Sequence, residues 1–96
     1  MALKIEWSIE AKTNLINIIH YLEKNWTPKE VQFFSRRLNV QLSILVKTPA
    51  IYKKSDKLHG AHECVLTKQN TLFYTFDEDK LYILSVWDNR QDAAKL

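Results

Sequence analysis

Glycine, proline and cysteine are scarce in this sequence. Its 96 residues include one Gly, two Pro and one Cys. The lone Gly60 rules out a glycine-rich loop that cradles phosphates, because such a loop needs several glycines at fixed spacing. The single Cys64 excludes a disulfide within the chain and leaves no set of thiolates for a metal. We therefore expect no nucleotide-binding loop, no metal site and no cofactor.

Long apolar runs are also missing. No stretch reaches about 18 consecutive apolar residues, the length needed for a membrane-spanning helix. The first ten residues, MALKIEWSIE, lack the basic start and the apolar run of a signal peptide. These absences predict a cytoplasmic protein that does not contact a membrane.

The composition is that of a folded protein with a mild basic excess. Hydrophobic residues make up 46% of the chain, so we expect one domain over residues 1–96. The formal net charge is +3, and most of the excess lies between positions 36 and 57, where Asp56 is the one acid. That basic stretch either faces a polyanion or is a solvated helix face and loop. The sequence leaves both interpretations open.

Apolar periodicity predicts a strand, two helices and three further strands. Apolar and polar residues alternate over 3–7, which predicts a short strand. Ser8 can cap a helix over residues 9–25, where apolar residues recur at helical spacing. Thr27-Pro28-Lys29-Glu30 is typical of a capping box, and the second helix that it begins ends before Pro49. Three β-like runs follow at residues 62–67, 72–76 and 81–87.

This order predicts an α+β fold, β-α-α-β-β-β. Almost no loop separates the two helices, so they should form an antiparallel hairpin. After an N-terminal strand, the hairpin should pack on one face of an antiparallel sheet. The other face of the sheet is then available for a ligand or a partner.

Short motifs spread over the chain resemble those of the RelE/ParE toxin family. They are W-S-x-E-A from Trp7 to Ala11, L-x-x-I-x-x-Y-L from Leu15 to Leu22, Trp26, Pro49 with Tyr52, His62-Glu63, Leu72 to Tyr74, and the ending W-D-N-R-Q-D-A-A-K-L. One departure is Ala93 or Ala94, where the family often has Pro. The resemblance implies the toxin of a bacterial type II toxin–antitoxin system, bound by a cognate antitoxin in a hetero-oligomer. It leaves two activities open: RelE-like members cleave messenger RNA on the ribosome, whereas ParE-like members poison DNA gyrase.

Cleavage of RNA without a metal needs a base, a cation for the phosphorane and an acid. Arg90, Glu63 and Lys68 are the catalytic candidates here. Arg90 lies in the closing motif and could bind a phosphate bidentately, or it could tie down the tail through a nearby aspartate. His62 and Glu63 are neighbours in a strand, so they should face opposite ways. Other polar candidates considered are His59, Tyr74, Asp88 and Lys95.

The predicted strands are poor in cations. None of the segments 62–67, 72–76 and 81–87 contains Lys or Arg. A RelE-like nuclease would need a cationic sheet face, so this absence favours a ParE-like, gyrase-directed binder. A ribosome-dependent endonuclease and an inactive binding module with the same fold remain as alternatives.

Aromatic and basic residues predict where a partner binds. Phe33 and Phe34 are adjacent, so they point about 100° apart on a helix and one of them can be exposed. An exposed ring beside Arg36 and Arg37 would suit an acidic, amphipathic antitoxin segment. The residues expected to bind the antitoxin or the target are Phe33, Arg36, Arg37, Lys53, Lys54 and Trp87.

Overall fold

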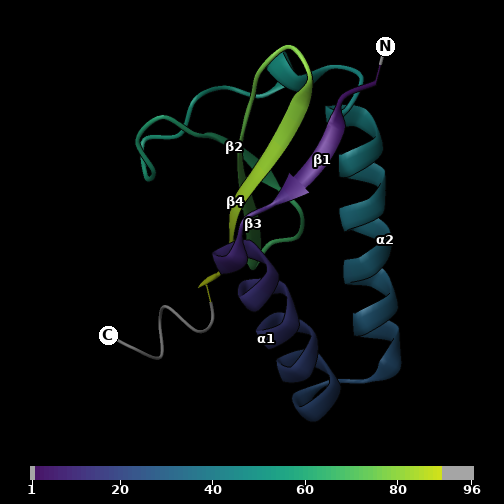
Figure 1. Cartoon of the computed structure of the whole chain (residues 1–96). Helices are drawn as coiled ribbons and strands as arrows, with labels where there is room; N and C mark the ends of the chain where they lie inside the picture. The colour runs from purple at the N-terminus through teal and green to yellow at the C-terminus, as the bar shows by residue number, and fades with distance from the viewer. Residues whose placement is uncertain (1, 90–96) are drawn as a thin grey trace.

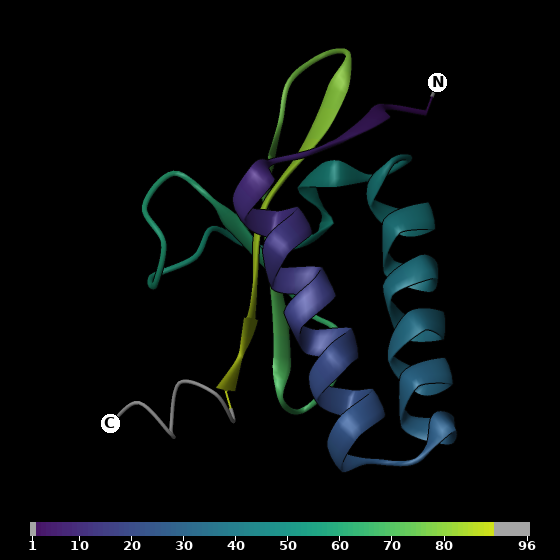
Figure 2. The same ribbon diagram turned by 60° about the horizontal axis from the view of Figure 1, so that its bottom comes forward.

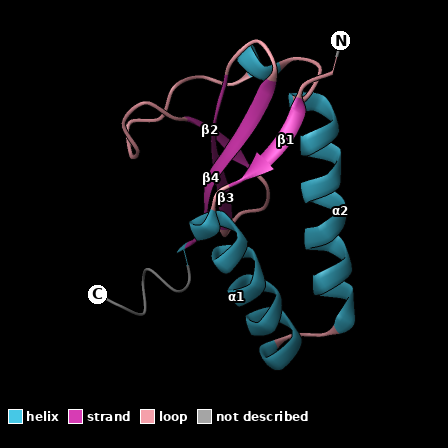
Figure 3. Cartoon of the chain, viewed as in Figure 1, coloured by secondary structure: helices cyan, strands magenta, loops and turns pink. Residues whose placement is uncertain are grey.

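Two helices pack on one face of a four-stranded sheet in the computed structural model, which describes residues 2–89 (Figure 1). The elements are β1 (Lys4–Trp7), α1 (Ile9–Asn25), α2 (Pro28–Leu45), a single 3-10 turn η1 (Pro49–Ile51), β2 (His62–Val65), β3 (Asn70–Phe76) and β4 (Lys80–Asp88). Figure 3 shows helices and strands in separate colours, with α1 and α2 joined by a short connection. The predicted α+β class, element order and helical hairpin are confirmed.

The sheet is mixed, with the order β1-β4-β3-β2. Strands β2, β3 and β4 form the expected antiparallel meander, but β1 pairs with β4 in parallel, with Ile5 opposite Leu81 and Trp7 opposite Ile83. The expectation of a fully antiparallel sheet therefore needs this one correction. Alternating side chains predict which face a strand buries, but they carry no information about the direction of its neighbour.

Ser8 connects the first helix to the sheet. Its Oγ accepts a hydrogen bond from the Ala11 N–H at 2.9 Å, which is the predicted N-cap. The same hydroxyl donates to the Leu84 carbonyl of β4 at 2.7 Å. One side chain thus begins α1 and attaches that end of the helix to a strand that lies 76 positions away in the sequence.

Replacing Ser8 by Ala should lower the free energy of unfolding by about 1–2 kcal/mol, because the variant loses the cap and leaves the Leu84 carbonyl without this donor. Urea unfolding measures the change. Ser43→Ala is the matched control, because that exposed hydroxyl bonds only to the carbonyls of the preceding helical turn. Equal costs for the two variants would show that the link between Ser8 and β4 contributes nothing.

The second helix begins at Pro28, as predicted, but Thr27 does not complete a capping box. Its side chain makes no capping hydrogen bond to the backbone. Instead, the Thr27 hydroxyl donates to Glu30 Oε1 at 3.3 Å, and the Glu30 N–H donates to the Thr27 carbonyl at 3.0 Å. Proline at the first helical position and the backbone bond are enough to start the helix.

The core lies between the helical hairpin and the sheet. Ile18 of α1 and Phe34 of α2 are at most 2% exposed, and they belong to the same buried cluster as Leu72 of β3 and Ile83 of β4. Figure 2, turned from the first view, shows the helices on one side of the strands and the loop before β2 extending away from α2. Among residues 2–89, no helix has the length and apolar character needed to cross a membrane.

The strand boundaries differ from those predicted at the turn between β2 and β3. β2 ends at Val65 and β3 begins at Asn70, whereas the sequence predicted strands over 62–67 and 72–76. The Thr67 hydroxyl accepts from the N–H groups of Gln69 and Asn70, both at 3.2 Å. Residues 66 and 67, which were predicted to extend β2, belong to this turn instead. Serine and threonine side chains can compete with a sheet for backbone N–H groups in this way.

Candidate functional site

The sheet face opposite the helices, here called the outer face, carries two of the predicted site residues. Strand pairing aligns Glu63 with Phe73 and Ser85 in one row, and Val65 with Thr71 and Trp87 in the next. The rings of Phe73 and Trp87 are in contact, with centroids 4.5 Å apart. Phe73 and Ser85 are at most 1% exposed, whereas Glu63 and Trp87 are half-buried. These two rows of the outer face therefore contain no Lys or Arg, where a nuclease would need positive charge.

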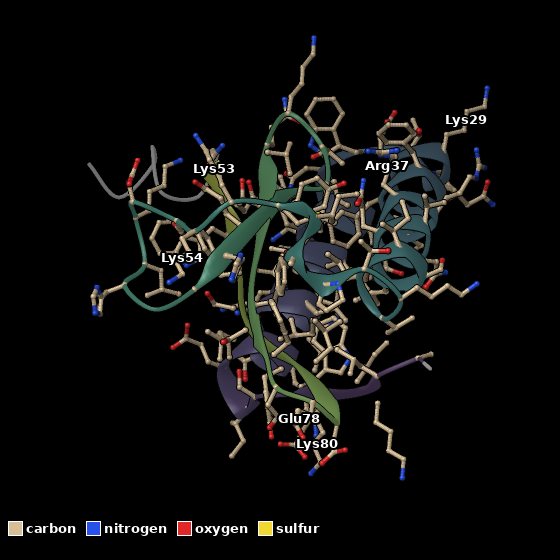
Figure 4. All side chains as sticks on the ribbon, turned by 90° about the horizontal axis from the view of Figure 1, so that it is seen from above. Lys29, Arg37, Lys53, Lys54, Glu78 and Lys80 are labelled. Carbon is tan, nitrogen blue, oxygen red and sulfur yellow. The ribbon has the colours of Figure 1, made fainter. Side chains whose placement is uncertain are left out.

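A basic loop borders the edge strand β2. The Glu63 N–H donates to the Lys53 carbonyl at 3.3 Å, and Lys54 forms an isolated bridge with His62. Both lysines are exposed, and Figure 4 shows them on the loop beside the sheet. The backbone thus holds Lys53 and Lys54 next to Glu63.

The predicted basic stretch does not form one surface. In Figure 4, Arg37 lies on α2, on the side of the sheet away from Lys54. The Arg37 Nε donates to the Leu66 carbonyl at 3.0 Å, so this guanidinium attaches α2 to the end of the β2 strand. Arg36, its neighbour, is exposed. Sequence proximity suggested a single patch, but the chain reverses between α2 and β2 and divides it.

Glu63 and Lys68 are not brought together. Lys68 is exposed in the turn that follows β2, five positions beyond Glu63. Among the described residues, no ion pair joins the two side chains. Arg90, the third catalytic candidate, and Lys95 lie outside the described residues. Asp88, which precedes them at the end of β4, is buried.

His62 faces the helices, on the opposite side of β2 from Glu63, as the strand alternation predicts. Its ring lies 5.3 Å from the Tyr74 ring, and its Nδ1 lies 2.8 Å from the Tyr52 carbonyl. A carbonyl only accepts, so Nδ1 carries the proton in this contact. The imidazole thus fixes the segment after η1 to the sheet.

Tyr74 and Cys64 belong to the core and not to a reactive site. Both are fully buried, and the Tyr74 hydroxyl donates to the Pro49 carbonyl at 2.7 Å. Burial raises the pKa of Tyr74 to about 12 and that of Cys64 to about 11. A thiol with so high a pKa is a poor nucleophile near neutral pH.

A groove at the end of the helical hairpin was not predicted from the sequence. Its volume is about 190 Å³. The groove is lined by three segments of the chain. The first is the end of α1, with Leu22 and the following Trp26, and the second is the start of α2, with Glu30, Phe33 and Phe34. The third runs from the turn after β2 to the first residue of β3, with Thr67, Gln69 and Asn70. We call this surface the hairpin groove. In the sequence, Trp26 lies one position after the predicted helix 9–25, and nothing there joined it to residues 67–70.

The exposed ring of the adjacent pair is Phe33. Phe33 is 50% exposed and Phe34 is 2% exposed, which confirms that only one of the two fills the core. Trp26, on the other wall of the hairpin groove, is 49% exposed. Two large rings thus border an opening whose floor includes the buried Leu22 and Phe34.

The family model described as "ParE toxin of type II toxin-antitoxin system, parDE" matches residues 5–93 of this chain. That match covers most of the sequence. No curated protein matches the chain by sequence.

Several solved structures share the fold. A chain of the chromosomal ParDE toxin–antitoxin system from P. aeruginosa superposes with a TM-score of 0.68 and 16% identity, over 91% of this chain and 96% of that one. The YoeB dimer from Staphylococcus aureus gives a TM-score of 0.61 and 21% identity, over 91% and 97%. The E. coli DinJ-YafQ toxin–antitoxin complex gives a TM-score of 0.61 and 10% identity, over 95% and 97%. At these identities the likeness establishes the fold alone.

Proposed function

Since this chain belongs to the ParE toxin family of type II toxin–antitoxin systems, we propose that it arrests growth by binding DNA gyrase. A cognate antitoxin silences it in a toxin–antitoxin hetero-oligomer. The similar structures include a ParDE system and a DinJ-YafQ complex, which supports an antitoxin as partner. On this proposal the chain acts by occupying its target and cleaves nothing.

The shortage of cations on the sheet is the observation that carries the proposal. RNA cleavage without a metal needs a base, an acid and a cation within reach of one phosphate. Among the described strands, β2 and β3 contain no Lys or Arg. The one cation of β4, Lys80, donates to Glu6 Oε1 at 3.2 Å near the turn between β3 and β4. The apolar side chains that the outer face does expose in this region, Val65 at 61% and the half-buried Trp87, suit a protein surface better than a phosphate.

A RelE-like, ribosome-dependent mRNA endonuclease is the second candidate. The observation in its favour is the basic loop, which holds Lys53 and Lys54 beside Glu63. That loop could supply lysine charges near the Glu63 carboxylate, although no ion pair joins Glu63 to Lys53, Lys54 or Lys68 among the described residues. An inactive toxin-fold binding module, which would arrest nothing, is the third.

The test is incorporation of labelled thymidine and labelled methionine after inducing the chain without its antitoxin. We expect thymidine incorporation to fall first, because a poisoned gyrase stops replication before translation. Purified chain should also inhibit supercoiling by purified gyrase. Glu63→Gln is the matched variant: it preserves shape and removes the carboxylate, so a gyrase binder keeps its arrest and a nuclease that uses Glu63 loses it.

Early loss of methionine incorporation alone would contradict the gyrase proposal and favour the endonuclease. Ribosomes purified with a defined message would then show cleavage that Glu63→Gln abolishes. Growth at the uninduced rate, with the chain present at the same level, would instead support the inactive binding module.

A further inference from the structure

The two edges of the sheet differ in how they are covered. The strand order β1-β4-β3-β2 makes β1 and β2 the edge strands (Figure 1). The loop before β2 covers that edge, because the Glu63 N–H donates to the Lys53 carbonyl and Lys54 forms a bridge with His62. Strand β1 has no such loop beside it among residues 2–89. An uncovered edge strand is a template for pairing with another strand.

Hydrogen bonds to β4 show which backbone groups of β1 point away from the sheet. The Lys4 N–H donates to the Asp79 carbonyl at 3.0 Å, and the Ser8 N–H donates to the Ile83 carbonyl at 3.0 Å. Backbone groups at even-numbered positions therefore point towards β4. Since these groups alternate along a strand, those at odd-numbered positions point outwards.

Two of the outward positions have unpaired backbone groups. The Leu3 N–H is bound, because it donates to the Val46 carbonyl at 2.9 Å. Ile5 and Trp7 make no backbone hydrogen bond on that side with any of residues 2–89. The Ile5 side chain is also 40% exposed, whereas Leu3 and Trp7 pack against the core. A further strand at this edge would cover the Ile5 side chain and bind the open N–H and C=O groups.

The charges of β1 restrict the kind of strand that fits. Lys4 lies opposite Lys80 of β4, and like charges directly opposite each other destabilise a sheet. Lys80 pairs with Glu6 at 3.2 Å, and no carboxylate among residues 2–89 forms an ion pair with Lys4. A strand that brings an acid to the open side of Lys4 is therefore favoured.

A second copy of β1, running antiparallel, supplies that acid. If Ile5 lies opposite Ile5 of the second copy, Lys4 lies opposite Glu6 at both ends of the pair. The two Ile5 residues then exchange both of their backbone bonds. Each Trp7 N–H can donate to the Leu3 carbonyl of the other copy.

Other registers are worse. A slip of one residue would place the side chains on the wrong faces of the sheet. A shift that keeps the faces in phase sets Lys4 against Lys4 or Glu6 against Glu6, and both pairs repel. The register centred on Ile5 is the one of these that pairs opposite charges.

We propose that two copies of this chain associate edge to edge through β1, antiparallel and in the register centred on Ile5. The two four-stranded sheets then form one continuous sheet. Directly opposite residues of an antiparallel pair point to the same face, so both outer faces lie on one side of the dimer. The dimer presents two copies of the surface that contains Val65 and Trp87. This inference goes beyond the proposed function and does not depend on the target.

Analytical ultracentrifugation of the purified chain, from low to high micromolar concentration, measures the association. We expect a reversible equilibrium between monomer and dimer. Glu6→Lys sets a lysine against Lys4 at both ends of the pair, so the dissociation constant should rise about tenfold or more. The double variant Lys4→Glu with Glu6→Lys restores opposite charges and should return to within about threefold of the wild type.

Glu23→Lys is the matched control for Glu6→Lys. It makes the same change in net charge at an exposed position of α1, away from β1. The dissociation constant should stay within about twofold of the wild type, because screened charges at a distance contribute little. Circular dichroism of every variant checks that the fold is retained.

Amide hydrogen exchange locates the contact independently. At concentrations where the chain is a dimer, the amides of Ile5 and Trp7 should exchange about tenfold more slowly than in the dilute chain. Lys4 and Ser8 are the internal controls, since their N–H groups bond to the Asp79 and Ile83 carbonyls in either state. Their exchange should not depend on concentration.

A chain that stays monomeric at high micromolar concentration, with Ile5 and Trp7 exchanging freely, would overturn the inference. So would a dimer that Glu6→Lys weakens no more than Glu23→Lys does, because the contact would then lie elsewhere. Protection of Ile5 and Trp7 only after the antitoxin is added, in a chain that is monomeric alone, would also contradict it. A chain that dimerises as described but arrests no growth would support the inference while the gyrase proposal fails.

Discussion

Replacing Phe34 by Ala is expected to lower the free energy of unfolding by about 3–5 kcal/mol, the cost of deleting a buried aromatic ring. Phe34 is 2% exposed and belongs to the cluster that joins α2 to α1 and the sheet. Domains of this size are stable by about 5–15 kcal/mol, so the variant should lose about a fifth of its stability or more. Urea unfolding followed by far-ultraviolet circular dichroism gives the number.

Phe33→Ala is the matched control, because it removes the same side chain one position away. Phe33 is 50% exposed, and its ring borders the hairpin groove instead of filling the core. We expect its cost in stability to stay within about 0.5 kcal/mol. Similar losses for the two variants would mean that the assignment of one ring to the core and one to the surface is wrong. The pair also separates folding from docking, because only Phe33 is assigned to the partner.

The helices could be predicted because their signals are local. Ser8 caps α1 and the predicted range 9–25 matches Ile9–Asn25, while Pro28 begins α2 as predicted. Thr27 shows where local reasoning fails. A hydroxyl beside a helix start has more than one acceptor within reach, and here it donates to Glu30 Oε1 instead of capping the backbone.

The sheet and the candidate site depend on contacts between distant segments. Apolar alternation predicted β1 but not its parallel pairing with β4. The basic residues at 36–37 and 53–54 are close in sequence, but α2 and the loop before β2 separate them. Among the described residues, the side-chain NH₂ of Asn70 is left unpaired by the turn at Thr67, where the Thr67 hydroxyl makes three hydrogen bonds. Hydrophobic periodicity in the sequence does not predict such a turn.

The same contacts explain why family membership leaves the activity open. The residues that match the family motifs include Trp7, Leu22 and Tyr74, which pack in or against the core and maintain the fold. The residues that would distinguish a nuclease from a gyrase binder lie on loops and on the outer face: Glu63 on β2, Lys53 and Lys54 on the adjoining loop, and the exposed Lys68 in the turn after β2. Function must therefore be decided by variants of those exposed residues.

Alkaline pH is expected to destabilise the fold through Cys64 and Tyr74. Desolvation raises the pKa of Cys64 from 9.0 to about 11, and that of Tyr74 from 10.0 to about 12. Both groups are acids that stay protonated in the folded state while the unfolded chain has already released its protons. Stability is thus complete below about pH 9 and falls as the pH rises through the unfolded values towards the folded ones. The combined loss between about pH 8 and about pH 11 should be roughly 3–4 kcal/mol.

Tyr74→Phe isolates one of the two contributions. It removes the hydroxyl that donates to the Pro49 carbonyl, so it should cost about 1 kcal/mol at neutral pH. Above about pH 9 its stability should fall less steeply than that of the wild type, since only Cys64 remains as a buried acid. Tyr82, whose pKa is raised by its hydrogen bond to Asp77, is present in both proteins and cancels in the comparison. Chemical unfolding at a series of pH values measures both slopes. Parallel curves for the two proteins would show that Tyr74 ionises in the folded state as readily as in the unfolded chain, and that the ring is not enclosed by the core.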